Sequence, residues 1–111
     1  MKFISWILNF FRFSRRKKIY RLEYLEEIPD HLASKTLYVL GERDDPWSAS
    51  LLCPCNCGEK IQLSLLSNES PSWNLVENGT NGKVSLMPSV WRQKGCKSHF
   101  FFTNNEITWC D

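Results

Sequence analysis

The chain has 111 residues, of which 42% are hydrophobic and 23% charged, and its formal net charge is +2. This length and composition predict a single folded domain and exclude a disordered or low-complexity chain. Residues 1–22 carry seven basic and no acidic side chains, whereas residues 23–111 carry seven basic and twelve acidic ones. The acidic body argues against a general nucleic-acid-binding surface, so nucleic acid is not an expected partner.

The first segment, residues 1–18, predicts an amphipathic basic helix. A narrow polar stripe runs from Lys2 to Arg16, and apolar residues fill the rest of its surface. Its uncharged run, residues 3–11, is shorter than the roughly 20 residues that span a bilayer, and we find no signal-peptide cleavage site after it. We expect this helix to dock on a partner or on its own domain. The alternative is a membrane-interface helix whose basic residues face anionic headgroups.

The rest of the chain, residues 19–111, predicts a series of short strands. Residues 26–33 are expected to form a turn or a single helical turn, and residues 43–47 a polar turn. Two Asn-Gly pairs in residues 78–82 predict a tight hairpin, and residues 103–105 predict a weaker one. The fold class is therefore β-rich, all-β or small α+β, and built from antiparallel hairpins. The expected strands are residues 19–25, 35–42, 48–53, 60–66, 72–77, 83–88, 98–102 and 106–110.

Five candidate metal ligands fall in two predicted turns. Three cysteines stand at alternate positions in the turn after residues 48–53, and a Cys-x-x-His pair lies further on. Structural zinc takes four thiolate or imidazole ligands in a tetrahedron, and two turns that each offer a pair would supply them. Which two of the three clustered cysteines bind stays open. The candidates are Cys53, Cys55, Cys57, Cys96 and His99, and the preferred set is Cys55, Cys57, Cys96 and His99.

The alternatives to one structural Zn²⁺ are weaker. A disulfide framework requires an oxidising compartment, but the cysteines number five and no signal peptide is found. A Rieske cluster needs two histidines, and His31 is expected at the surface. A catalytic metal lacks its usual acid–base motifs, and a cysteine nucleophile lacks a base beside it. Cys110 is a weaker ligand candidate, and we predict no catalytic or cofactor-binding residue.

Three stretches, "PWSASLLCPCNCGEKIQLSLL", "VSLMPSVWRQKGCKSHFFF" and "ITWC", resemble an uncharacterised bacterial family. That family is associated with operons for ubiquitin-like proteins and their activating- and conjugating-enzyme-like partners. Its pattern is Cys-x-Cys-Gly-Cys-Gly followed by Cys-x-Ser-His-aromatic, and Asn56 replaces one glycine, a mild change because Asn tolerates a left-handed backbone. The resemblance implies as motif positions Cys53, Cys55, Cys57, Gly58, Cys96, Ser98, His99 and Phe100.

The expected function is that of a non-enzymatic adaptor with one structural zinc. The resemblance implies protein partners that are ubiquitin-like or conjugating-enzyme-like, in a bacterial ubiquitin-like conjugation system. Trp47, Trp73 and Trp91 are candidate partner contacts if they are exposed. One alternative is a metal- or cysteine-dependent enzyme or ligase-like factor of that pathway, and another is a peripheral membrane protein anchored by residues 1–18. The expected location is the cytoplasm, with the inner face of the membrane as a second site.

Overall fold

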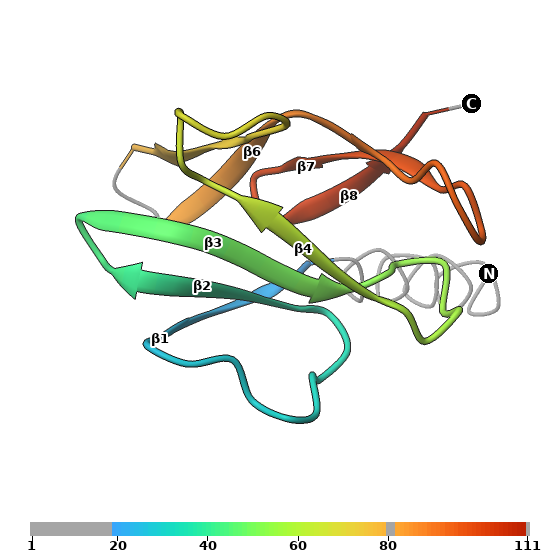
Figure 1. The fold of residues 1–111 in the computed structure, drawn as a ribbon, viewed down its shortest axis with the longest axis horizontal. Coiled ribbons are helices and arrows are strands. Elements are labelled where there is room, and N and C mark those ends of the chain that lie inside the picture. The colour runs from blue at the N-terminus through green and yellow to red at the C-terminus, as the bar shows by residue number, and fades with distance from the viewer. Residues whose placement is uncertain (1–18, 80–81, 111) are drawn as a thin grey trace, which may run out of the picture.

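The computed structural model describes residues 19–79 and 82–110, which form two four-stranded sheets (Figure 1). This part of the chain contains no helix, so none there reaches the length and hydropathy of a membrane span. The β-rich prediction is confirmed, and the helix predicted for residues 1–18 lies outside the described residues. The strands are β1 (Arg21–Leu25), β2 (Thr36–Glu42), β3 (Asp45–Leu52), β4 (Lys60–Ser64), β5 (Asn74–Asn78), β6 (Lys83–Trp91), β7 (His99–Thr103) and β8 (Glu106–Trp109).

The first sheet has the order β1-β2-β3-β4. Strands β3 and β4 are antiparallel, so the three clustered cysteines lie in a hairpin turn, as predicted. Strand β1, in contrast, runs parallel to β2, and the expectation of antiparallel neighbours throughout is wrong at this edge. A parallel pair needs a long return connection, and residues 26–35 supply one as an irregular loop.

The second sheet has the order β5-β6-β7-β8, and all its neighbouring strands are antiparallel. Pairing between β5 and β6 reaches Asn78 and Lys83, where the sequence predicts a hairpin. Strands β7 and β8 join through Asn104 and Asn105, with φ angles of 50° and 63°. Two consecutive positive φ angles define the turn that matches the twist of a two-residue hairpin, and Asn adopts them readily.

Strand β6 continues past Pro88 to Trp91, beyond the strand end predicted from sequence. Its register with β7 shifts between Leu86, which pairs with Phe102, and Val90, which pairs with Phe100. Residues 87–89 of β6 therefore lie opposite a single residue of β7. Such a bulge re-aims the side chains of the strand that carries it, and here it includes Ser89.

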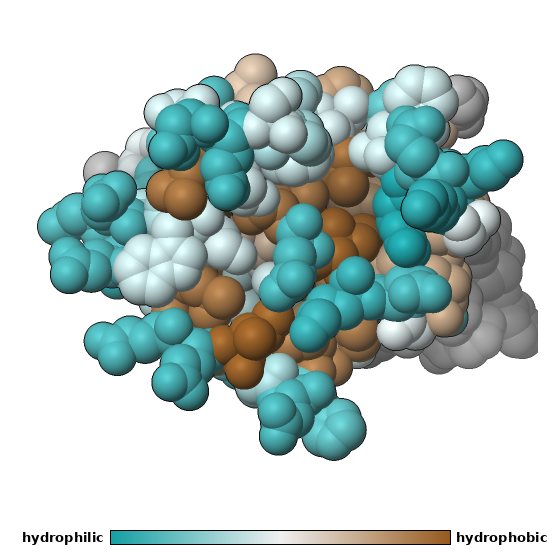
Figure 2. Space-filling view, viewed as in Figure 1, coloured by the Kyte–Doolittle hydropathy of each residue, from teal (hydrophilic) through white to brown (hydrophobic). Residues whose placement is uncertain are grey.

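The hydrophobic core lies between the two sheets, which form the two layers seen in Figure 1. Leu37 and Leu51 from the first sheet and Leu86 and Phe102 from the second are at most 1% exposed. Figure 2 shows hydrophobic side chains through the middle of this face and mostly hydrophilic side chains around its outline. Burial of this apolar area is the main stabilising term for so small a domain.

The segment before β1 joins the two sheets. The Tyr20 amide donates a hydrogen bond to the Asn105 carbonyl (2.6 Å), and Ile19 forms a β-bridge with Glu106. The side chain of Asn105 is buried, and its Oδ1 accepts a hydrogen bond from the Val84 amide (2.8 Å). One asparagine thus connects strand β6, the β7–β8 turn and the chain that enters the first sheet.

Candidate active site and metal centre

The tips of two hairpins bring four cysteine sulfurs together. Cys53, Cys55 and Cys57 come from the β3–β4 turn and Cys96 from the β6–β7 turn, and their Sγ atoms lie within 4.8 Å of one another. The Cys53 sulfur is 3.4 Å from that of Cys55 and 3.5 Å from that of Cys96. Asn56 has a φ of 69°, so the left-handed conformation anticipated for this position is present and lets the turn curl around the sulfurs.

These separations fit a bound metal ion better than disulfides. A Zn–S bond of about 2.3 Å implies sulfurs about 3.8 Å apart at the corners of a tetrahedron. A disulfide would need about 2.05 Å, and all five cysteines are free. The four cysteines can therefore hold a metal ion between them, and Cys110 lies outside this group.

Polar groups surround the cysteine cluster. The Ser98 hydroxyl lies 3.0 Å from the Cys96 sulfur, and Arg92 Nη1 lies 3.6 Å from the sulfurs of both Cys57 and Cys96. The hydrogen bond with Ser98 is the main reason why the pKa of Cys96 is lowered to about 6. The hydrogen bond with Cys96 is the main reason why the pKa of Cys55 is raised to about 12. Cys96 is thus a more readily ionised sulfur than Cys55, and metal ions bind cysteine as the thiolate.

His99, the fifth ligand candidate, lies in a different environment. It begins strand β7, and its Nε2 is 2.8 Å from the hydroxyl oxygen of Ser89, in the bulged part of β6. The structure therefore groups the four cysteines with one another and His99 with a serine. Within residues 19–79 and 82–110, Ser89 is the hydrogen-bond partner of the His99 ring, so the two form a pair rather than a triad with a described carboxylate.

Two tryptophans support this pair. The Trp91 indole stacks on the His99 ring, with centroids 4.8 Å apart and planes inclined by 13°. The Trp73 indole N–H donates a hydrogen bond to the Ser89 carbonyl (3.2 Å). The imidazole face and the Ser89 backbone are thus both fixed by large rings, which pre-organises the Ser–His geometry.

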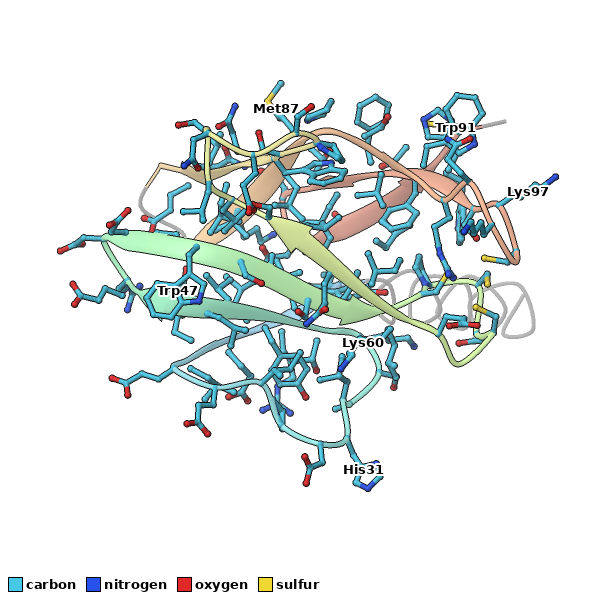
Figure 3. All side chains as sticks on the ribbon, in the orientation of Figure 1. His31, Trp47, Lys60, Met87, Trp91 and Lys97 are labelled. Carbon is cyan, nitrogen blue, oxygen red and sulfur yellow. The ribbon has the colours of Figure 1, made fainter. Side chains whose placement is uncertain are left out.

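The other residues singled out by sequence lie in different surroundings. Figure 3 shows His31 on the β1–β2 loop, where it is exposed as expected. Trp47 and Trp91 are 45% and 60% exposed, whereas Trp73 packs against the core. A cavity of about 600 Å³ lies beside the cysteine loop and is lined by residues that include Tyr20, Cys53 and Trp109; neither Ser89 nor His99 lines it.

The chemistry of a Ser–His pair is nucleophilic. A hydroxyl is a weak nucleophile until an adjacent base accepts its proton, and a histidine nitrogen at hydrogen-bonding distance is suited to that role. The 2.8 Å contact between Ser89 Oγ and His99 Nε2 is the hydroxyl–imidazole contact on which serine hydrolases rely.

The chain belongs to the family described as "Bacterial ubiquitination-like system serine protease (BubE)", whose family model matches residues 24–110. No curated protein and no solved structure matches the chain significantly. The expected membership of a bacterial family tied to ubiquitin-like conjugation is confirmed.

The expected non-enzymatic adaptor function is wrong, because the family is described as a serine protease. The reason lies in His99, whose Cys-x-x-His spacing favours a metal ligand when it is taken alone. The sequence did not single out Ser89. This serine directly follows a predicted strand that ends at Pro88, and it lies ten residues before His99 along the chain. The pairing of β6 with β7, together with its bulge, brings the two side chains together. A serine and a histidine on the two arms of one predicted hairpin would have been the signal to look for.

Proposed function

We propose that this chain is a serine protease in which Ser89 is the nucleophile and His99 the general base, and that its substrates are proteins of a bacterial ubiquitination-like system. The observation that carries the proposal is the 2.8 Å contact between Ser89 Oγ and His99 Nε2. The family description supports both the reaction class and the biological system.

The proposed reaction proceeds in two stages. Ser89 Oγ attacks the carbonyl carbon of the scissile amide while His99 Nε2 takes the hydroxyl proton. The C–N bond then breaks, His99 returns the proton to the leaving amine, and an ester on Ser89 is left. Water attacks this ester with His99 again as the base, which releases the carboxylic acid and restores the Ser89 hydroxyl.

We further propose that Cys53, Cys55, Cys57 and Cys96 bind one structural Zn²⁺. Four thiolates around Zn²⁺ carry a net charge of −2, which Arg92 at 3.6 Å from two of the sulfurs partly offsets. With Cys96 as a thiolate, the Ser98 hydroxyl 3.0 Å away would donate a hydrogen bond to it, as groups around a metal site commonly do. Such an ion would fasten the β6–β7 turn, whose two arms carry Ser89 and His99, to the β3–β4 turn.

The protease proposal is tested by labelling with an alkyl fluorophosphonate, which reacts with activated serines. Ser89 is expected to be labelled, as located by mass spectrometry, and Ser89→Ala to abolish labelling. His99→Gln is expected to lower the labelling rate by about 100-fold or more. Ser34→Ala, which changes an exposed serine in the β1–β2 loop of the other sheet, is the control and should label normally.

The substrate class is tested with ubiquitin-like proteins of such systems, alone and joined to a target. The wild-type chain is expected to cleave at least one of them and Ser89→Ala to cleave none. If Ser89→Ala were still labelled, or still cleaved a substrate, as the wild-type chain does, the assignment of Ser89 as the nucleophile would be refuted.

A further inference from the structure

The edge of strand β6 next to Ser89 has no neighbouring strand in the part of the chain that the structure describes. Strand β5 pairs with β6 only as far as Met87, which faces Asn74. Just before β5, the Trp73 amide bonds the Ser64 carbonyl, so the chain there turns to the first sheet. Residues 88–91 thus extend beyond the start of β5.

The backbone of Trp91 points toward this open edge. Neighbouring groups fix its direction: the Arg92 amide donates to the Ser98 carbonyl (2.8 Å), and the Cys110 amide donates to the His99 carbonyl (2.9 Å). Because hydrogen-bonded and non-hydrogen-bonded pairs alternate in an antiparallel ladder, the intervening Trp91–His99 pair is non-hydrogen-bonded. The Trp91 N–H and C=O are therefore directed away from β7.

The Ser89 carbonyl points the same way, which an independent contact establishes. It accepts the Trp73 indole N–H, a group on the β5 side of the strand. Ser89 and Trp91 thus direct their backbone groups to one edge, about 7 Å apart along the strand. Among residues 19–79 and 82–110, none hydrogen bonds the Trp91 N–H or C=O.

The side chains beside this edge are apolar. Met87 and Trp91 are 56% and 60% exposed, and Figure 3 shows both projecting from the second sheet on the side away from the first. Phe101, which lies opposite the bulge on β7, is also exposed. An unpaired strand edge and an apolar surface therefore meet at the Ser–His pair.

We propose, resting on the proposed function, that the substrate binds as an extended peptide segment added to β6 at Trp91, with an apolar side chain against Trp91 and Met87. Strand addition satisfies the N–H and C=O of Trp91 and aligns a substrate carbonyl with Ser89 on the same strand. The cleaved site must then lie in a segment of the substrate protein that can become extended, not in a folded helix.

The test measures protection of Ser89 from the alkyl fluorophosphonate by boronic acids, which bind reversibly to activated serines. The probes are acetyl-boroPhe and acetyl-Ala-Ala-Ala-boroPhe, and the latter with each amide nitrogen methylated in turn. The tetrapeptide is expected to protect at a concentration about tenfold lower than the single residue, because it gains two or more backbone hydrogen bonds. Methylation is expected to abolish this gain only at the amide nitrogen that donates to the Trp91 carbonyl.

Two variants of the full chain isolate the backbone contribution. Trp91→Ala removes the indole and keeps the N–H, whereas Trp91→Pro removes both, and proline is tolerated on an unpaired strand edge. The tetrapeptide gain is expected to persist in Trp91→Ala and to vanish in Trp91→Pro. Melting temperature reports whether each variant is folded, and the gain is measured relative to acetyl-boroPhe in the same variant, so that a change in Ser89 reactivity cancels.

Equal protection by both boronic acids, or a gain that no methylated position removes, would overturn the strand-addition proposal. The protease proposal would still stand in that case, provided that Ser89 is labelled. Sedimentation as a dimer that Trp91→Pro dissociates would also overturn it, because a second copy would then occupy the edge. Absence of Ser89 labelling in the wild-type chain would instead refute the proposed function, and the substrate proposal with it.

Discussion

The Trp91 indole and the His99 imidazole are cross-strand partners whose rings lie face to face, 4.8 Å apart and inclined by 13°. The stack leaves the imidazole little freedom to rotate, and His99 Nε2 is directed at Ser89 from this position. The orientation of the proposed base is therefore set by an exposed tryptophan on the strand that also carries the nucleophile.

Replacing Trp91 by alanine is expected to slow fluorophosphonate labelling of Ser89 by about three- to tenfold, which corresponds to the loss of one aromatic pair. Trp91→Phe should give an intermediate rate. Trp47→Ala, which removes an exposed indole from the first sheet, is the control and should label at the wild-type rate. If Trp91→Ala had the same effect in a His99→Gln background, the stack would not act through His99.

Loss of one cysteine ligand is expected to remove the metal and destabilise the domain. Cys57→Ser should lower the metal content from one ion per chain and reduce stability by at least about 2 kcal/mol, or about 10 °C in Tm for a domain of this size. Cys110→Ser changes a cysteine outside the cluster and should leave both quantities unchanged. Elemental analysis with thermal melting checks this, and a Cys57→Ser chain with full metal content would contradict the four-cysteine site.

Gly41→Ala is expected to destabilise the first sheet by about 2–3 kcal/mol. Gly41 has a φ of 115°, and a Cβ there would lie 2.7 Å from Cε3 of the Trp47 ring. Gly79→Ala is the matched control, since Gly79 has a φ of 66° with open space around it, and should cost about 1 kcal/mol. Urea unfolding measures the difference, and equal costs would show that the Trp47 ring moves aside.

Asn105→Gly is expected to cost about 2 kcal/mol of stability, because it leaves the buried Val84 amide without the Oδ1 acceptor. Glycine retains the φ of 63°, so the comparison isolates the side chain. Asn104→Gly, at the neighbouring exposed turn position, should change stability by less than about 1 kcal/mol. A similar cost for both substitutions would place the effect in the turn rather than in the link to β6.

Local patterns predicted most of the strands because alternation and turn residues act over a few positions. These local patterns predicted the hairpin around Cys53–Cys57 and the turn at Asn104 and Asn105. The direction of β1 did not, because periodicity carries no information about whether a long loop reverses the chain. Pro88 was read as a strand end, although a bulge accommodates it within β6.

The two halves of the candidate site differ in how far the sequence reveals them. Thiol chemistry makes the cysteine group recognisable from spacing alone, so its members could be named before their geometry was known. Serine is common and its reactivity depends on a neighbour, so Ser89 became a candidate only when the pairing of β6 with β7 placed His99 at 2.8 Å. His99 itself is ambiguous in sequence because imidazole serves as metal ligand and as base.

The shift of register between β6 and β7 has a consequence for changes in chain length. Suppose that a one-residue insertion or deletion between Ser89 and Phe102 shifted the register of β7 against β6 by one residue. His99 would then turn to the buried face, because side chains alternate along a strand. The exposed loop of residues 26–35 has no such constraint. Proteins that share this Ser–His arrangement are therefore expected to vary in length at the β1–β2 loop and to keep the β6–β7 hairpin in phase.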